Sequence, residues 1–235
     1  MGNLTYLVVG ASSGIGRQLA IQLSESENHV YATYNKNRIE DDNNLLDYYH
    51  CNVLDENMDL DFLPDHLDGL AYCPGSINLK PFQRINPENF ISDFQLQVVG
   101  AIKVIQKVLQ KLKSAGNASI VLISTVAVQQ GMNFHTQIAT SKGAIEGLTK
   151  SLAAEFAPGI RVNCIAPSLT DTPLAARLLS NKEQKENNAQ RHPLKRIGTV
   201  NDIANAAEFL LSANSGWITG QIVHVDGGMS SIKLL

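Results

Sequence analysis

Short apolar runs alternate with longer segments of helical periodicity along this chain. Runs rich in valine, isoleucine and tyrosine, which are typical of strands, are LTYLVVG, HVYATY, LDGLAYC, SIVLIST and IRVNCIA. Between them lie segments with a helical pattern, among them residues 14–25, 87–114 and 137–156. Repeated strand–helix–strand units predict a parallel sheet that carries helices on both faces.

The predicted fold is an α/β, doubly wound parallel sheet (Rossmann-like) in a single domain, residues 1–235. The chain has 44% hydrophobic residues, enough for one sizeable core, and no linker of biased composition divides it. The continuously apolar strand segments LVV and IVLI fit strands that are covered on both sides. In such sheets ligands bind beyond the carboxyl ends of the strands, so functional residues are expected in the loops that follow them.

Charge and cysteine content exclude several classes of protein. The formal net charge of −3 argues against a nucleic-acid-binding surface. The 3 cysteines are far apart and lie in or beside apolar runs, which argues against a disulfide framework or a metal site and fits a reducing cytoplasm. The N-terminal run lacks the basic lead of a signal peptide, and we expect neither export nor membrane association.

A glycine-rich segment follows the first predicted strand and opens the first predicted helix. Its glycines have the spacing G-x-x-x-G-x-G, which lets the backbone turn tightly and approach a diphosphate. Free amide groups at the helix N-terminus would stabilise the negative charge, and two serines add hydroxyl donors. The residues assigned to this phosphate-binding segment are Gly10, Ser12, Ser13, Gly14, Ile15 and Gly16.

The end of the second predicted strand bears on which dinucleotide is bound. A carboxylate at this point would hold an unphosphorylated ribose, but the chain has Thr33, Tyr34, Asn35 and Lys36 here. The missing carboxylate removes repulsion toward a 2′-phosphate, and Lys36 can attract one. We therefore expect NADP(H) rather than NAD(H), the alternative being that Lys36 is only a solvated loop charge.

Together with SIVLISTVA, the run SKGAIEGLTKSLAAEFAPGIRVNCIAPS and the C-terminal HPLKRIGTVNDIANAAEFLLS…WITGQIVHVDGG, these motifs resemble the short-chain dehydrogenase/reductase family. The resemblance covers nearly the entire chain and is greatest for the 3-oxoacyl-carrier-protein reductase type. It implies a nicotinamide-dependent oxidoreductase that acts on a small-molecule carbonyl/alcohol pair.

The resemblance implies further cofactor contacts at positions that match the family's motifs. Asn52 and Val53 match an Asp-Val pair near the adenine, and of the family's Asn-Asn-Ala-Gly stretch only the glycine is kept. Pro167 matches a Pro-Gly motif beside the nicotinamide, with Ser168 in place of the glycine. The residues assigned in this way are Asn52, Val53, Cys73, Pro74, Gly75, Pro167, Ser168, Thr170 and Thr172.

The catalytic positions depart further from the family. Thr125 stands at the family's serine and Gln97 at its asparagine. Ile138 stands at the tyrosine that donates a proton. Only Lys142, one helical turn later, is unchanged, and in the family this lysine also hydrogen-bonds the nicotinamide ribose.

An isoleucine cannot donate a proton, and losing a general acid typically costs roughly 10²–10⁴-fold in rate. One hypothesis keeps the oxidoreductase activity and assigns the proton to His135, because imidazole exchanges protons near neutral pH. Thr125 is a weaker direct donor because its hydroxyl is a poor acid, and a water held by Lys142 is a third route. The alternative hypothesis is a catalytically inactive dinucleotide-binding module that acts as a sensor or assembly partner. The retained glycines, Lys142 and Thr172 favour the enzyme.

Residues 173–192 form an apolar helical turn and a polar helical segment, which by resemblance cover the substrate as a mobile lid. Leu174, Leu178 and Leu179 either line the substrate or pack as ordinary core. His192 is expected to be structural, with a place in the cleft as the alternative. The resemblance also implies a homo-dimer or homo-tetramer formed through the long helices.

Overall fold

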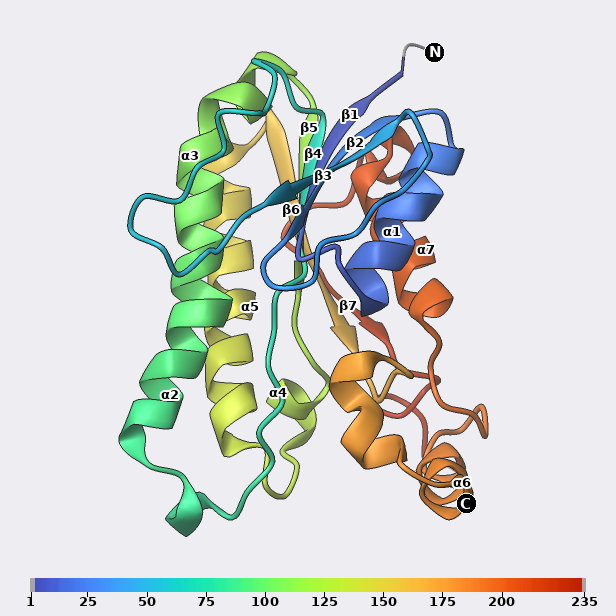
Figure 1. Ribbon diagram of the computed structural model, residues 1–235. Helices are drawn as coiled ribbons and strands as arrows, with labels where there is room; N and C mark the ends of the chain where they lie inside the picture. Colours follow the sequence, from blue (N-terminus) through green and yellow to red (C-terminus); the bar gives the residue numbers. More distant parts are fainter. Residues whose placement is uncertain (1–2, 234–235) are drawn as a thin grey trace.

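The computed structural model describes residues 3–233, which form a seven-stranded sheet with helices on both faces (Figure 1). Adjacent strands pair in parallel in the order β3-β2-β1-β4-β5-β6-β7. The strands are β1 (Thr5–Val9), β2 (His29–Tyr34), β3 (Leu46–His50), β4 (Gly69–Tyr72), β5 (Ala118–Ile123), β6 (Ile160–Pro167) and β7 (Ile222–Val225). The doubly wound parallel α/β fold predicted from the sequence is confirmed.

Two layers of helices cover the sheet. Helices α1 and α7 pack against each other on one face, and α3 and α5 lie on the other (Figure 1). The α-helices are α1 (Gly14–Glu25), α2 (Pro87–Phe94), α3 (Gly100–Ser114), α4 (Ala127–Gln130), α5 (Thr136–Phe156), α6 (Lys182–Gln190) and α7 (Val200–Leu211). Shorter helical turns are η1 (Phe82–Arg84), η2 (Gln95–Val99), η3 (Pro173–Leu179) and η4 (Ala213–Ser215).

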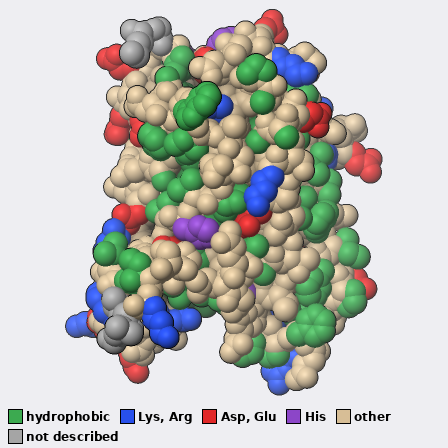
Figure 2. Space-filling model, turned by 180° about the vertical axis from the view of Figure 1, so that it is seen from behind, with side chains coloured by type: hydrophobic (Ala, Val, Ile, Leu, Met, Phe, Trp, Pro, Cys, Tyr) green, Lys and Arg blue, Asp and Glu red, His purple; other side chains and the backbone are tan. Residues whose placement is uncertain are grey.

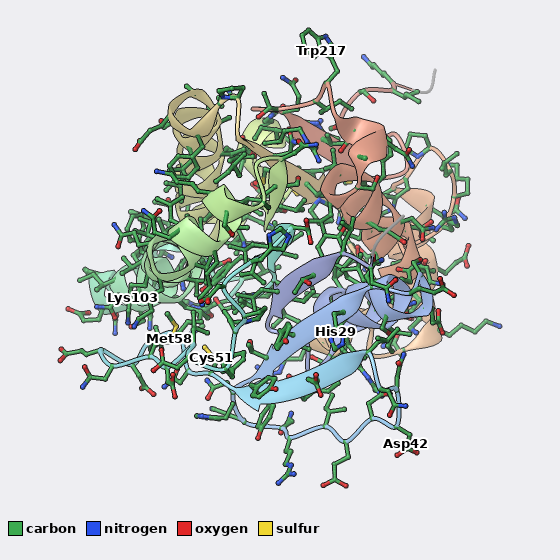
Figure 3. All side chains as sticks on the ribbon, turned by 90° about the horizontal axis from the view of Figure 1, so that it is seen from above. His29, Asp42, Cys51, Met58, Lys103 and Trp217 are labelled. Atoms are coloured by element: carbon green, nitrogen blue, oxygen red, sulfur yellow. The ribbon has the colours of Figure 1, made fainter. Side chains whose placement is uncertain are left out.

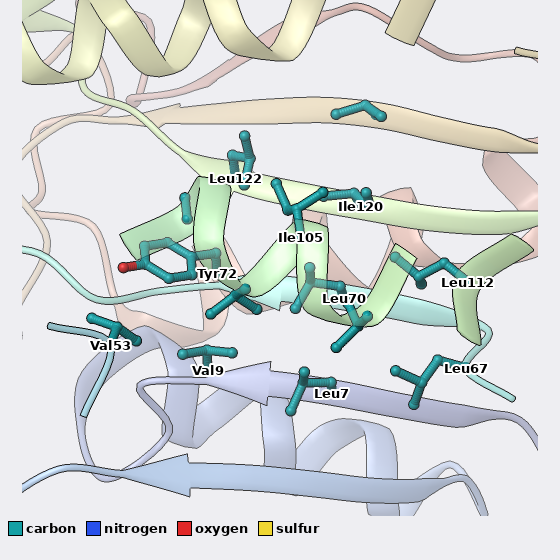
Figure 4. Packing of buried hydrophobic residues seen from close by; sticks show 14 of the residues in the cluster. Leu7, Val9, Val53, Leu67, Leu70, Tyr72, Ile105, Leu112, Ile120 and Leu122 are labelled. Carbon is teal, nitrogen blue, oxygen red and sulfur yellow. The ribbon is translucent and has the colours of Figure 1, made fainter. Parts of the chain in front are cut away.

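Strand β1 shows why its sequence is apolar without alternation. Its side chains point to opposite faces in turn, and each face has its own core. Leu7 and Val9 pack into the core under α3 and α5, which Figure 4 shows from close by. Tyr6 and Val8 pack into the core under α1 and α7. The sheet order reverses direction at β1, between β2 and β4, which is where such sheets form a binding crevice.

The helix predicted over residues 87–114 is confirmed, and it contains one irregular turn that was not predicted. A π-helical turn, η2, separates α2 from α3. The buried hydroxyl of Tyr72 donates to the carbonyl of Leu96 inside this turn at 2.6 Å. The hydroxyl also lies against Gly100, where a Cβ would collide with it. The wider turn therefore accommodates a phenol that comes from the neighbouring strand, which the periodicity of the helix does not reveal.

The segment between β3 and β4 crosses the outside of the core and is fixed by two lysines. Lys103 donates from its Nζ to the carbonyl of Val53 at 3.2 Å, and Lys111 donates to that of Leu63 at 3.1 Å. In the view of Figure 3, Lys103 lies beside the part of the chain that carries Cys51 and Met58. This contact holds the Asn52–Val53 backbone in place at the carboxyl edge of the sheet.

Helix α7 begins with a capping box that an arginine reinforces. The Thr199 hydroxyl accepts from the Asp202 amide at 3.2 Å, and the Asp202 carboxylate accepts from the Thr199 amide at 2.7 Å. Arg196 donates to both oxygens of Asp202, at 2.6 and 2.7 Å. These hydrogen bonds from Arg196, with those from Thr199, hold the pKa of Asp202 well below its usual range, although partial burial acts in the opposite direction.

Replacing Asp202 with asparagine should lower the free energy of unfolding near neutral pH by about 1 kcal/mol, the usual value of a lost cap. Because the pKa is depressed in the folded state, the contribution of Asp202 is present above the ordinary carboxyl pKa of about 4 and is lost as the pH falls below it. Urea unfolding at pH 7 and pH 3 tests this, with the exposed Asp42→Asn as control. An equal difference at both pH values would contradict the assignment.

Across residues 3–233, none of the helices combines the length and the apolar character that crossing a bilayer requires.

Candidate cofactor and active site

The glycine loop lies at the carboxyl end of β1. Gly10 and Gly14 adopt left-handed backbone conformations, with φ of +77° and +57°, that only glycine adopts without strain. A Cβ on Gly16 would collide with the carbonyl oxygen of Gly10 and lie 3.1 Å from the Cβ of Cys73. Thr33 is buried behind the loop, and its hydroxyl accepts from the Gly10 amide at 3.1 Å. Thr33, which was predicted to contact the cofactor, is instead buried and stabilises the loop through this hydrogen bond.

The first turn of α1 has the free amides that an anion needs. Ser13 is the N-cap residue, yet within the described chain its side chain makes no capping hydrogen bond. Ser12 is half-buried and Ser13 is exposed. The backbone amides at the start of α1 and these hydroxyls fit the diphosphate of a dinucleotide, because glycines leave room for close approach.

Beyond β2 and β3 the chain forms a polar rim. Tyr34 packs edge-on to His50, and Asn35 and Lys36 are exposed. Asn35 donates to the side chain of Asn52 at 3.5 Å, which joins the two loops. The side chain of Val53 is buried in the core, so only its backbone is available to a ligand. At the end of β2 the rim has no carboxylate, and the charged side chain nearest to this strand end in the sequence is Lys36.

A cavity of about 280 Å³ opens beside the glycine loop, and it brings together most of the predicted catalytic and nicotinamide-side residues. Residues Ile15, Cys73, Gly75, Gln97, Thr125, His135, Ile138, Lys142, Pro167, Ser168, Thr170 and Thr172 line it. The remaining predicted contacts lie outside this lining, namely Pro74 after β4 and those in the glycine loop and at the ends of β2 and β3. Its apolar wall includes Ile77, Leu79, Met132 and Met229, which carried no recognisable pattern in the sequence.

Three strand-to-helix connections meet around the cavity. Gly14 of the glycine loop approaches Thr172, since a Cβ there would lie 3.5 Å from the Cβ of the threonine. The amide of Val126 donates to the carbonyl of Pro167 at 3.1 Å, which ties the segment after β5 to the end of β6. Thr125 and Ser168 therefore sit on adjacent backbone segments at the carboxyl edge of the sheet.

Lys142 lies on α5, one turn after Ile138, and is 7% exposed. Burial of the ammonium group lowers the pKa of Lys142 to about 8, and nearby acidic groups, including Asp93, partly oppose that shift. A lysine of this kind can donate hydrogen bonds to a ribose and stabilise negative charge on an oxygen in the cavity.

A buried polar network that the sequence analysis missed surrounds Gln97. The Gln97 amide nitrogen donates to both carboxylate oxygens of Asp93, at 2.8 Å each, and Ser76 also donates to Asp93. The Gln97 Oε1 atom is buried and has no partner within the described chain. A Cβ on Gly75 would lie 3.5 Å from this oxygen and 3.9 Å from Lys142 Nζ. Because Gly75 has no side chain, a space remains between Gln97 Oε1 and Lys142 Nζ, and a hydroxyl group or a water molecule would fit there. In the sequence, the only sign of this network is that Asp93 stands four residues before Gln97, one helical turn away.

The polypeptide around residues 173–192 forms η3 and α6, in agreement with the helical pattern of that segment. Leu174 and Leu178 line the cavity, whereas Leu179 is buried and does not. His192 is buried and also lines the cavity, so the expectation that it is only structural is incomplete.

Comparison with known proteins identifies the family. A family model described as enoyl-(acyl carrier protein) reductase matches residues 10–230. The chain is 32% identical over 233 residues to the 3-oxoacyl-[acyl-carrier-protein] reductase FabG of Rickettsia bellii, with 96% of each protein covered. It is 33% identical over 149 residues to the peroxisomal 2,4-dienoyl-CoA reductase SPS19 of Saccharomyces cerevisiae. That match covers 63% of this chain but only about half, 51%, of the yeast protein.

Solved structures agree with the sequence relatives. The ligand-free aldohexose dehydrogenase of Thermoplasma acidophilum is similar with a TM-score of 0.92 at 25% identity, and the match covers 99% of this chain and 96% of that one. With a family model across most of its length and a curated relative matched end to end, the chain belongs to the short-chain dehydrogenase/reductase family, whose members are oxidoreductases that bind NAD(P)(H).

Proposed function

We propose that this protein is an NAD(P)-dependent oxidoreductase that interconverts a small-molecule carbonyl and alcohol with an atypical proton donor. The observation that carries the proposal is the cavity beside the glycine loop, in which Thr125 and Lys142 lie together. A glycine loop with an uncapped helix start supports a bound diphosphate, and a buried lysine supports an oriented ribose.

In this proposal, different segments of the chain bind different parts of the cofactor. Gly10 to Gly16 would hold the diphosphate, and the Asn52–Val53 backbone the adenine. Cys73 to Gly75 and Pro167 to Thr172 would flank the nicotinamide end, and Lys142 the adjoining ribose. NADP(H) is favoured over NAD(H), because Lys36 is exposed at the end of β2 and the residues beside it carry no carboxylate. When bound, the cofactor supplies or accepts the hydride.

The same cavity would hold the substrate oxygen. Thr125 keeps a hydroxyl to hydrogen-bond it, and Lys142 would stabilise negative charge that develops there. Ile138 cannot exchange a proton, so another group must do so. His135 lines the cavity, and its Nδ1 atom lies 2.7 Å from the carbonyl oxygen of Asn133, which leaves Nε2 for proton exchange. His135 and a water held by Lys142 are therefore the donors that the sequence reasoning proposes.

The segment 173–192 would act as a lid over the substrate, because Leu174, Leu178 and Asn188 line the cavity from it. The apolar lining suits a substrate whose body is hydrophobic. We further propose a cytoplasmic homo-dimer or homo-tetramer. Hydrophobic side chains gather at the lower right of Figure 2, the side of α2, and Phe82, Ile91 and Phe94 are exposed on η1 and α2.

The decisive experiment begins with titration of the purified protein with NADPH and, separately, NADH, followed by nicotinamide fluorescence. Binding that prefers NADPH is expected, and Lys36→Ala should reduce that preference about tenfold, the value of one charged contact. The neighbouring exposed Arg38→Ala is the matched control. Equal loss in both variants would indicate a general charge effect rather than a contact to a 2′-phosphate.

A panel of ketones and aldehydes should then be offered with NADPH. Turnover that falls at least tenfold in Lys142→Ala supports the enzyme, because the lysine would contact both the ribose and the developing charge. Tight cofactor binding without turnover across the panel would instead favour a catalytically inactive dinucleotide-binding module. That alternative is motivated by the simultaneous departures from the family's residues at Gln97, Thr125 and Ile138.

A further inference from the structure

Two cavities share a wall that contains a hydrogen-bonded serine–histidine pair. The main cavity and a second one of about 210 Å³ are both lined by Ser168, Leu169, Thr170 and His192, so these residues separate them. The hydroxyl oxygen of Ser168 lies 2.8 Å from His192 Nε2 across this wall. Ser168 is half-buried and His192 is buried.

The hydrogen bonds of His192 fix its tautomer. Its Nδ1 atom lies 2.9 Å from the carbonyl oxygen of Asn188, which can only accept, so Nδ1 carries a hydrogen. In the neutral ring Nε2 must then accept from the Ser168 hydroxyl. In the protonated ring Nε2 donates to the Ser168 oxygen, and the serine hydrogen is released for another acceptor. The sulfur of Met229, 3.1 Å from the hydroxyl oxygen, is only a weak acceptor.

Ser168 lines the cavity that holds the substrate oxygen in the proposed reaction. It follows Pro167, whose carbonyl binds the amide of Val126, the residue after Thr125. Ser168 lines the same cavity as Ile138 and Lys142. The cavity that Ser168 lines has isoleucine, and so no phenol, at position 138.

The second cavity connects His192 to polar surroundings. Its lining includes the charged side chains Arg196, Asp202 and Asp226. A cavity with several polar partners is suited to water, from which a buried imidazole can regain a proton. On the main side, the charged and titratable side chains of the lining are Arg191, Lys142, His135 and Cys73.

We propose that Ser168 and His192, in place of His135 or a water held by Lys142, form a proton relay that supplies the proton which Ile138 cannot. The inference rests on the proposed function. As the carbonyl carbon receives hydride, its oxygen takes the hydrogen of the Ser168 hydroxyl, and the serine oxygen takes the Nε2 hydrogen of protonated His192. The imidazole becomes neutral, and its Nε2 takes up a proton from solvent before the next reduction. In alcohol oxidation the same transfers run in reverse.

The first arm of the test does not require turnover. Imidazole nitrogen NMR of the protein saturated with NADPH should show that the neutral form of His192 carries its hydrogen on Nδ1. Ser168→Ala should shift the Nε2 resonance of His192, because that atom loses its donor. Ser92→Ala, which removes an exposed hydroxyl on α2, is the matched control and should leave the resonance in place. An Nε2 resonance insensitive to Ser168→Ala would overturn the relay.

The second arm measures reduction of a ketone or aldehyde that the wild type accepts. With NADPH at a saturating concentration for each variant, Ser168→Ala and His192→Gln should each lower kcat by roughly 10² or more. The double variant should lose no more than the worse single variant, because both residues serve one path. His66→Gln, at an exposed histidine far from the cavity, controls for loss of an imidazole and should leave kcat unchanged.

The outcomes separate the two proposals. Wild-type activity that persists within threefold in Ser168→Ala would overturn the relay and leave the enzyme intact. The same result together with a loss of kcat in His135→Asn would assign the proton to His135. A wild type that binds NADPH but reduces no carbonyl would overturn the proposed activity itself, and the relay with it.

Discussion

Replacing Ile138 with tyrosine should increase carbonyl reduction, by roughly 10²–10⁴-fold, the usual contribution of a general acid. Ile138 lies one helical turn before Lys142 on α5, and both line the same cavity. A phenol introduced there would stand beside the ammonium group of Lys142, which favours the phenolate and makes the phenol a better acid. The measurement is kcat with NADPH and a ketone or aldehyde from the panel.

The control for this gain is Ile138→Phe, which adds the ring without the hydroxyl. It should leave kcat at or below the wild-type value, so the hydroxyl alone accounts for the difference. In the Ile138→Tyr background, Ser168→Ala should cost much less than in the wild type, because a second donor then serves the same oxygen. Equal rates for the tyrosine and phenylalanine variants would contradict the placement of residue 138 beside the substrate oxygen.

The sequence predicted those features of the fold that depend on local periodicity. Continuous apolar runs gave β1 and β5, because strands covered on both faces need no polar side. Strand β3, with the sequence LDYYH, was not recognised, since it lies at the sheet edge and several of its side chains are exposed. The π-helical turn η2 was also not predicted, because it accommodates Tyr72 from a neighbouring strand.

The candidate site also contains features that could be predicted from the local sequence and features that could not. The glycine loop could be predicted because each glycine is required locally, either by a left-handed φ or by a close approach of other atoms. The pairing of Ser168 with His192 was not, since it depends on how η3 and α6 fold back over the end of β6. The role of Asp93 was likewise not predicted, because it depends on burial of the carboxylate and on its hydrogen bond from Gln97. Tertiary contacts between distant segments therefore carry the part of the chemistry that is particular to this chain.

Replacing Gly16 with alanine should abolish dinucleotide binding, with a loss of at least 100-fold in NADPH affinity. The added Cβ would collide with the carbonyl oxygen of Gly10 and press on the Cβ of Cys73 at 3.1 Å. Both neighbours are in the loop regions that would hold the cofactor, so the clash can be relieved only by moving the proposed site. Overpacking of this kind should also lower the free energy of unfolding by about 1–3 kcal/mol. NADPH fluorescence titration and urea unfolding measure the two effects.

Gly147→Ala provides a control with the same chemical change and a different environment. Gly147 is exposed within α5, and a Cβ there would have no neighbour within 4 Å in the described chain. That variant should keep NADPH affinity and gain about 0.5–1 kcal/mol of stability, because alanine is the better helix former. Should Gly16→Ala bind NADPH within threefold of wild type, the glycine loop would not be the diphosphate site. A loss of affinity confined to Gly16→Ala would instead mean that close backbone approach, rather than any side chain of the loop, makes this edge of the sheet a nucleotide site.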